Sequence, residues 1–367
     1  NYSKRNDQHD ETKPHRIMEN INVPLLASIC EIAGAPGFEQ RVRELVINQI
    51  KDVVDEYSID NMGNLTALKR GTSSDKKVMI GAHMDEIGFI VTHIDDKGFI
   101  RFHTLGGFDP KTLTAQRVII HGKKDLVGVM GSKPIHVMTA AERTKVPKTT
   151  DYFIDLGRSR DEVIKYISVG DSITRERKLI EMGDCVNCKS IDNRVSVFIL
   201  IETLKQLKEF PYDVYGVFTV QEEVGIRGAQ VATLQIQPDF GFGLDTTIAY
   251  DVPGAAAHEK ITELGKGAAI KIMDSQTICD YRMVRYMKEL AAKKNLNTQV
   301  EILPAGGTDT MGIQRFTAGG SIAGAVSIPT RHIHQVIEMA HKDDIQQSIE
   351  LLKACIENLD QYDWSFR

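Results

Sequence analysis

The sequence is short of several features that mark particular classes of protein. It has 5 cysteines and 1 tryptophan among 367 residues, and its net charge is only -5 at pH 7. So few cysteines do not make a disulfide framework and suit a reducing compartment, so we expect a cytoplasmic protein. The weak negative charge offers no attraction for phosphate backbones or anionic membranes, and we expect neither nucleic acid nor a membrane as a partner.

Long hydrophobic segments are also missing. The longest apolar run covers only Val195 to Ile201, far short of the roughly 20 residues that a membrane-spanning helix needs. Residues 1–16 are polar and mixed in charge. Because they lack the apolar core of a secretory signal, we interpret them as a disordered N-terminal extension. The remaining composition, 42% hydrophobic and 26% charged, predicts a soluble globular protein.

Helix-like and strand-like patterns alternate along most of the chain. Helices are predicted over residues 23–33, 40–50, 192–207, 277–293 and 343–359, with a further helix after Gly228. Strands are predicted over residues 53–59, 65–68, 78–82, 212–220, 240–244 and 268–273. Alternation of this kind predicts an α/β fold with a mostly parallel sheet between layers of helices.

The middle of the chain departs from that alternation. Between residues 86 and 183, short β-branched segments such as IGFIVTHI and LVGVMG are separated by glycine, which predicts a small all-β unit. We therefore expect an α/β domain made of residues 17–85 and 184–367, interrupted by an inserted β domain at 86–183.

Candidate ligands follow two of the predicted strands. His83 comes directly after the strand at 78–82, in the segment HMDE, and Asp245 follows the strand at 240–244. Open α/β sheets bind ligands at the carboxyl ends of their strands. Asp85 could accept a hydrogen bond from the second ring nitrogen of His83 and so set its tautomer. The alternative is that His83 is a structural histidine that binds no metal.

Two adjacent carboxylates, Glu222 and Glu223, follow the strand at 212–220. Neighbouring carboxylates at a sheet edge repel each other unless a cation or separate roles offset the cost. Successive strand side chains point in opposite directions, so one glutamate could bind a metal while the other faces a reacting water. Surface charge is the alternative, and it fits poorly beside a buried strand.

Two further residues complete the candidate set. Asp192, in the segment SIDNR, could cap the following helix or bridge two cations. His334 ends the segment PTRHIH, after the strand-like SIAGAVSI. The candidate ligands are then His83, Asp192, Glu223, Asp245 and His334. Five nitrogen and oxygen donors suit two divalent ions such as zinc or cobalt that share an aspartate.

Several segments, taken in order, resemble a known family. They are AHMDEIGF, LGGFDP, SIDNR, QEEVGIRGA, GLDTT, GGTD and RHIH, and they extend over about residues 20–360. The chain is similar to the glutamyl aminopeptidase and tetrahedral (TET) aminopeptidase family of dinuclear metallopeptidases. Members of this family are also called deblocking aminopeptidases or endoglucanase-like proteins. Order, spacing and flanking residues all agree.

The resemblance implies an aminopeptidase that removes N-terminal residues from peptides with a water activated by two metal ions, zinc or cobalt. It implies one metal held by His83 and Asp245, another by Glu223 and His334, a bridging Asp192, a general base Glu222, and an Asp85 that orients His83. It also implies a three-layer α/β/α zinc-exopeptidase-like domain. The insert would be a PDZ-like dimerisation domain, and the assembly would be a homo-oligomer, a tetrahedral dodecamer built from dimers.

Some details depart from the family or stay open. The family commonly continues the last histidine with Ser-Pro, whereas Gln335 follows here, and His332 is the weaker ligand candidate. The GGTD segment could line the pocket for the first side chain or form an ordinary turn. Three basic residues near the motifs could favour acidic substrates, but we prefer surface solvation for Lys271, Arg227 and Lys266. We interpret the CxxC pair, Cys185 and Cys188, as plain thiols.

Two other functions remain as alternatives. A glycoside hydrolase could use the paired carboxylates Glu222 and Glu223, although neighbours on one strand diverge and do not flank one glycosidic bond. A non-catalytic scaffold would keep the fold and lose ligands or the base. Every one of these positions is filled here. The segments GxSxG and HExxH, which mark other hydrolases, are absent from the sequence.

Overall fold

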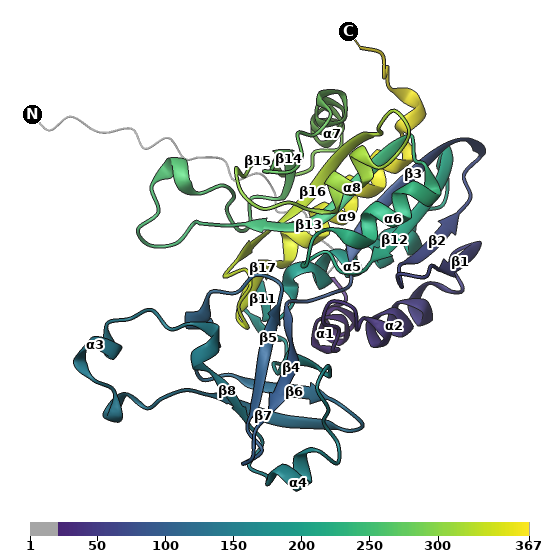
Figure 1. Ribbon diagram of the computed structural model, residues 1–367. Helices are drawn as coiled ribbons and strands as arrows, with labels where there is room; N and C mark the ends of the chain where they lie inside the picture. Colours follow the sequence, from purple (N-terminus) through teal and green to yellow (C-terminus); the bar gives the residue numbers. More distant parts are fainter. Residues whose placement is uncertain (1–20, 367) are drawn as a thin grey trace, which may run out of the picture.

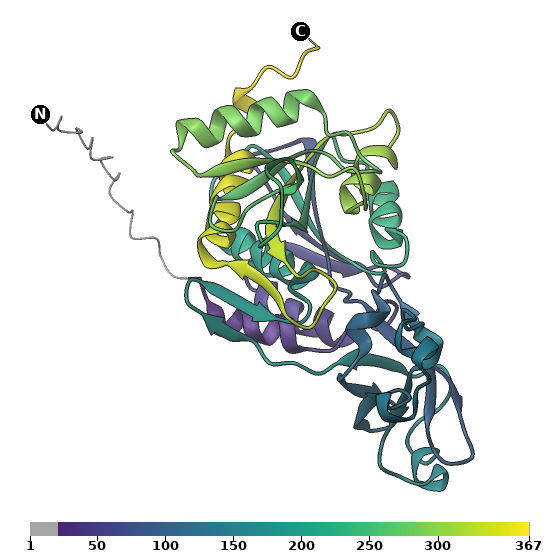
Figure 2. The same ribbon diagram turned by 90° about the vertical axis from the view of Figure 1, so that its left-hand side faces the viewer.

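The computed structural model describes residues 21–366. The predicted extension at residues 1–16 lies outside this range. Within it, the chain forms a large sheet covered by helices on both faces and a separate β barrel that projects from the sheet domain (Figures 1 and 2).

The described residues place eleven strands in one mixed sheet. Its main path, in spatial order, is β1 (Glu56–Ile59), β2 (Leu65–Lys69), β12 (Tyr212–Thr219), β3 (Ser73–His83), β13 (Phe240–Ile248), β16 (Ile322–Arg331), β17 (Glu338–His341), β11 (Cys185–Cys188) and β10 (Ile180–Met182). A branch adds β14 (Ala268–Met273), which pairs with β16, and β15 (Thr298–Ile302). The central strands β12, β3, β13 and β16 are parallel, so their carboxyl ends lie at one edge of the sheet.

Two groups of helices cover the sheet. One face packs against α1 (Val23–Glu31), α2 (Gln40–Ile50), α5 (Ile191–Gln206), α7 (Tyr281–Lys293) and α9 (Lys342–Glu357). The other face packs against α6 (Arg227–Ile236) and α8 (Asp309–Arg315). Because both faces are covered, the central strands are buried and read as nearly continuous apolar segments. The predicted α/β layering is confirmed, but the sheet is mixed rather than mostly parallel, because β1, β2, β17, β11 and β10 join it through antiparallel pairs.

The inserted strands close into a barrel with its own core. Its strands are β4 (Gly88–Ile94), β5 (Ile100–Leu105), β6 (Arg117–His121), β7 (Asp125–Gly131), β8 (Phe153–Asp155) and β9 (Ser172–Arg175), with the short helices α3 (Ala140–Arg143) and α4 (Arg160–Val163) between strands. Strand β10 falls inside the range predicted for the insert, yet it pairs with β11 in the large sheet. The chain therefore returns to the sheet domain earlier than the sequence pattern indicates.

Strands β11, β15 and β17 and helix α8 were not predicted from the sequence, and each depends on tertiary contacts. Helix α8 begins in the GGTD segment and contains Gly312. A Cβ atom there would lie 3.0 Å from Cβ of Ala229, so the glycine lets α8 approach α6 closely. Strand β15 is short and largely exposed, and its parallel pairing with β14 establishes it.

The predicted plain thiols are unpaired. All five cysteines are free. Cys185 and Cys188 are three residues apart on strand β11, so their side chains point to opposite faces.

Among the described residues, no helix combines the length and apolar character needed to cross a bilayer.

Candidate active site

Parallel strands bring predicted ligands to one edge of the sheet. His83 is the last residue of β3, and Asp245 lies in the neighbouring β13. Nε2 of His83 lies 3.8 Å from Oδ2 of Asp245 and 3.5 Å from Oδ1 of Asp192, which enters at the start of α5. All three side chains are buried.

Asp192 lies between two histidines. Its Oδ1 faces His83, and its Oδ2 lies 3.3 Å from Nε2 of His334. The same nitrogen of His334 lies 3.4 Å from Oε2 of Glu223. Two ligand groups therefore share the Asp192 carboxylate, one with the first histidine and Asp245, the other with the second histidine and Glu223. The helix-capping alternative does not describe this aspartate, because its carboxylate oxygens face the histidines.

The cluster has the chemistry of a divalent-metal site. Its donors are imidazole nitrogens and carboxylate oxygens, and the ligand atoms of each group lie within 4.8 Å of one another. Oε1 of Glu223 is buried and lacks a hydrogen-bond partner within residues 21–366. Burying carboxylates without a cation or full hydrogen bonding is costly. The residues present therefore fit divalent cations.

Burial and mutual repulsion perturb the titration of the cluster. Burial, with help from Asp245 and Glu223, raises the pKa of Glu222 well above its ordinary value. Burial also raises the pKa of Asp245 to about 7. For His334, burial would lower the pKa, but Glu223 and Asp192 outweigh it and raise the pKa to about 12. Perturbed groups gathered in one place are typical of functional sites.

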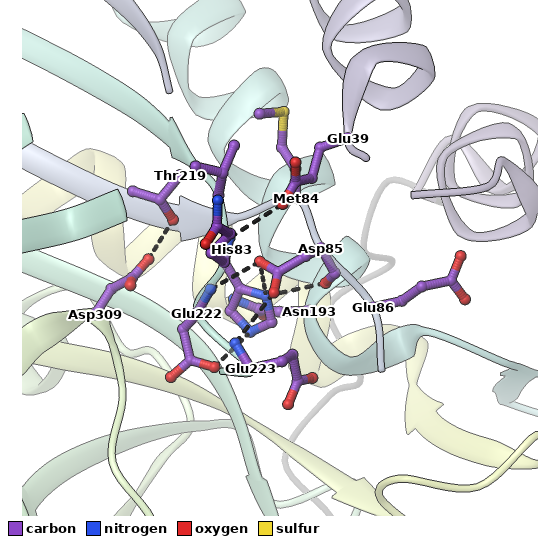
Figure 3. A network of polar contacts seen from close by, with 12 residues as sticks. Glu39, His83, Met84, Asp85, Glu86, Asn193, Thr219, Glu222, Glu223 and Asp309 are labelled. Atoms are coloured by element: carbon purple, nitrogen blue, oxygen red, sulfur yellow. Dashed lines mark hydrogen bonds and ion pairs between the residues drawn. The ribbon is translucent and has the colours of Figure 1, made fainter. Parts of the chain in front are cut away.

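Asp85 contacts His83, which it was predicted to orient, and also the loop that carries Glu222 and Glu223. Nδ1 of His83 lies 3.0 Å from the Asp85 backbone carbonyl and 3.3 Å from its Oδ1. The Asp85 carboxylate also accepts the backbone N–H groups of Glu222 at 3.0 Å and Glu223 at 3.1 Å (Figure 3). One buried carboxylate thus fixes both the ring and the loop that carries the paired glutamates.

Glu338 plays the corresponding part on the opposite side of the cluster. Its Oε2 accepts the backbone N–H of Asp192 at 2.8 Å, and its Oε1 accepts that of His334, also at 2.8 Å. His334 has a positive φ of 64°, and its carbonyl accepts Nη1 of Arg175 from β9 of the barrel at 3.1 Å. Sequence reasoning missed Glu338 and Arg175, because nothing local in the sequence shows what their side chains contact.

A buried cluster of charged residues connects the segments that carry His83 and Asp192. Glu86 accepts hydrogen bonds from Nζ of Lys189 at 2.8 and 2.9 Å and lies 3.4 Å from Nη2 of Arg194. Arg194 donates in turn to the Met84 carbonyl at 2.6 Å. The group joins the segment after His83 to the segment before Asp192, and the sequence patterns gave no sign of it.

A family model described as M42 glutamyl aminopeptidase matches residues 63–351. The chain belongs to the M42 glutamyl aminopeptidase family. It is an aminopeptidase, a peptide hydrolase, as the resemblance implied. Membership of this metallopeptidase family implies divalent metals, which agrees with the ligand groups around Asp192.

Individual relatives cover nearly the whole chain. A putative aminopeptidase of Acetivibrio thermocellus is 40% identical over 90% of this chain and 97% of its own length. The solved aminopeptidase APDkam598 of Desulfurococcus kamchatkensis is 38% identical, with a TM-score of 0.88 over 91% of this chain and 94% of that one. The TET1 peptidase of Pyrococcus horikoshii can assemble into a tetrahedron or a large octahedral shell. It is 30% identical, with a TM-score of 0.82 over 91% of this chain and 98% of that one.

In this M42 aminopeptidase the cluster opens into a cavity of about 710 Å³. Gly306, Gly307 and Thr308 of the GGTD segment line it. Asp309 does not, because it turns inward and accepts a hydrogen bond from the Thr219 hydroxyl (Figure 3). His332 belongs to none of the ligand groups found among residues 21–366.

The preferred interpretation of Lys271 was wrong. Its side chain is only 1% exposed and lines the cavity, rather than being solvated at the surface. Nζ lies 2.8 Å from Oδ2 of Asp274 and 3.2 Å from Oε1 of Glu301. The error arose in part because Glu301 lies on β15, which was not predicted, whereas Asp274 directly follows the predicted strand β14. Arg227 and Lys266 are exposed as expected.

Proposed function

We propose that this M42 aminopeptidase works with two divalent metal ions, zinc or cobalt. The ligands would be His83 and Asp245 for one ion, Glu223 and His334 for the other, and Asp192 for both. The position of Asp192 carries this proposal, because its two oxygens face different histidines at 3.5 and 3.3 Å. A carboxylate in that position suits a shared ligand.

We further propose Glu222 as the general base. Divalent cations at this cluster would polarise the scissile carbonyl and make an attacking water more acidic. Glu222 lines the cavity, and its Oε2 lies 3.7 Å from Nε2 of His83. Its backbone N–H is held by Asp85, so the carboxylate is positioned before substrate arrives. It would take a proton from water and return it to the leaving amine of an N-terminal peptide bond.

We propose that the barrel, taken as the PDZ-like domain of the resemblance, mediates dimerisation within a homo-oligomer. The outer face of β7 supports this, because Val127 and Val129 are exposed β-branched side chains while alternate residues are buried. Apolar groups on an outer face favour association. The shells formed by the Pyrococcus horikoshii relative suggest a tetrahedral dodecamer built from such dimers.

The enzymatic proposal is tested by removing metal with a chelator and restoring zinc or cobalt separately. Free and N-acetylated aminoacyl p-nitroanilides and short peptides serve as substrates, with cellulose fragments as the comparison for a glycoside hydrolase. We expect hydrolysis only with metal and a free N-terminus. Glu222→Gln should lower kcat by about 100-fold or more while metal content stays unchanged, whereas Glu223→Gln should also lose metal. Metal-independent hydrolysis, or cleavage of cellulose fragments alone, would refute the proposal.

A further inference from the structure

The wall of the cavity beyond the ligand cluster has a defined composition. Its side chains are mainly uncharged and include Ile226, Gln276, Leu303, Thr308 and Met311. Lys271 and Asp274 are the charged residues that line this part of the cavity, within the described chain. A peptide whose N-terminus lies at the cluster would place its first side chain against this wall.

The pairing of β14 with β15 determines where the charged residues of this wall lie. Lys271 of β14 is the register partner of Glu301 on the parallel strand β15, so the two side chains share one face of the sheet. Glu301 is fully buried behind the wall, and Asp274 follows directly after β14. The ammonium group therefore has one carboxylate beside it in the cavity wall and another behind it.

Both charges in the wall already have partners. Lys271 already pairs with Asp274 at 2.8 Å and Glu301 at 3.2 Å. Asp274 has further partners, because its Oδ1 accepts hydrogen bonds from the backbone N–H groups of Gln276 and Thr277 at 2.9 and 2.8 Å. Burial would lower the pKa of Lys271, but Glu301 and Asp274 outweigh it and raise that pKa. One ammonium facing two carboxylates leaves a net negative charge in the wall.

We infer that the first-residue pocket of this aminopeptidase takes an uncharged side chain, such as leucine or methionine, and discriminates against an acidic one. An acidic side chain would meet an ammonium group that two carboxylates already neutralise, and it would be repelled by the excess carboxylate. A basic side chain would have to displace Lys271 from Asp274. Uncharged side chains meet the apolar and amide groups of the wall without either cost. The inference rests on the proposed function, since it assumes that peptides bind with their N-terminus at the cluster.

The test compares kcat/KM for leucyl, methionyl, glutamyl and lysyl p-nitroanilides with the metal-loaded enzyme. We expect the leucyl or methionyl substrate to exceed both charged ones, and the glutamyl substrate to be lower by about tenfold or more. In Glu301→Gln the wall loses one negative charge, so the glutamyl-to-leucyl ratio should rise by about tenfold. Asp274→Asn should raise the same ratio, which provides a second variant if the first does not fold.

The matched control is Glu357→Gln, which removes a carboxylate paired with Lys353 at 3.1 Å on α9 and should leave the ratio unchanged. A wild-type preference for glutamate or lysine would overturn the inference while leaving the aminopeptidase mechanism intact. So would an unchanged ratio in both folded wall variants, with folding checked by thermal unfolding. Absence of hydrolysis with every substrate and metal would overturn the proposed function itself and the inference with it.

Discussion

At the scale of single residues, the site depends on carboxylates that bind backbone as much as on those that face the cluster. Asp85 and Glu338 each accept two backbone N–H groups from the residues of the cluster. Charge-assisted hydrogen bonds of this kind are short and strong. The bond to Glu338 holds His334 in a left-handed conformation that most residues adopt rarely.

Removing one of these supports should weaken metal binding. In Glu338→Gln a neutral amide replaces the carboxylate that holds the N–H groups of Asp192 and His334. Loss of supports around metal ligands typically costs about 10- to 100-fold in affinity, and we expect a drop of that size, measured by competition with a chromophoric chelator. The same change at Glu350, outside the site, should have no effect. Equal affinities in the two variants would contradict the positioning role.

At the scale of elements, buried and exposed ion pairs join segments that are far apart in the sequence. The pair between Glu86 and Lys189 is almost fully buried. The pair between Arg41 of α2 and Asp125 of β7 is largely exposed and links the sheet domain to the barrel through contacts of 2.6 and 2.9 Å. Their different burial leads to different expectations for stability.

The buried pair should be costly to break. Glu86→Gln would leave the ammonium of Lys189 and the guanidinium of Arg194 without a counter-charge in the interior. Breaking a buried pair typically costs about 3–5 kcal/mol, and we expect the free energy of unfolding in urea to fall by that amount. Glu56→Gln, which breaks an exposed pair with Arg70 at 2.7 Å, should leave the free energy of unfolding nearly unchanged, because water screens the pair. Similar losses in both variants would contradict this difference.

The exposed pair should make a small contribution that disappears in acid. Hydrogen bonds from Arg41 hold the pKa of Asp125 down to about 2, below the value of about 3.9 for an unfolded aspartate. A lowered pKa in the folded state stabilises above the unfolded pKa, and the effect is lost as the pH falls through the folded pKa. At neutral pH we expect the free energy of unfolding of the wild type to exceed that of Asp125→Asn by about 0.2–1 kcal/mol.

Urea unfolding of both proteins at several pH values measures this contribution. The difference between them should be constant above about pH 5 and should shrink progressively as the pH falls to about 2. A difference that is as large at pH 2 as at neutral pH would show that the substitution acts through packing instead of charge.

At the scale of the whole molecule, the barrel projects from the sheet domain (Figure 2), and its strand β7 exposes apolar side chains. Val127 is 58% exposed and Val129 47%. Two such side chains on one exposed strand face are well placed for contact with a second copy of the chain. The proposed dimerisation therefore makes a prediction about mass in solution.

Charges on this face should weaken the assembly. We expect Val127→Lys combined with Val129→Lys to lower the mass measured by sedimentation velocity, because ammonium groups would have to be buried at the contact. Ser28→Lys, an exposed position on α1, serves as the control and should leave the mass unchanged. If the double variant sediments as wild type does, this face is not the contact.

Much of the fold and of the cluster could be predicted from local patterns. His83, Glu223 and Asp245 lie at or just beyond the apolar segments that form the central strands, and parallel strands bring their ends to one edge. The structure brings these residues together with Asp192 and His334, as expected. Helix α8 and strand β15 could not be predicted, because close approach to α6 and pairing with β14 establish them.

The sequence by itself determined the α/β alternation, the family and the identity of the chemically active side chains, since each depends on the order of residues along the chain. Only the tertiary structure decided which groups surround them. Arg175 reaches His334 across 159 positions, and Glu338 reaches Asp192 across 146. Lys271 lost its expected solvation in part to Glu301, 30 positions away on the neighbouring strand β15. Contacts such as these depend on how the strands and helices pack, and no local pattern encodes that packing.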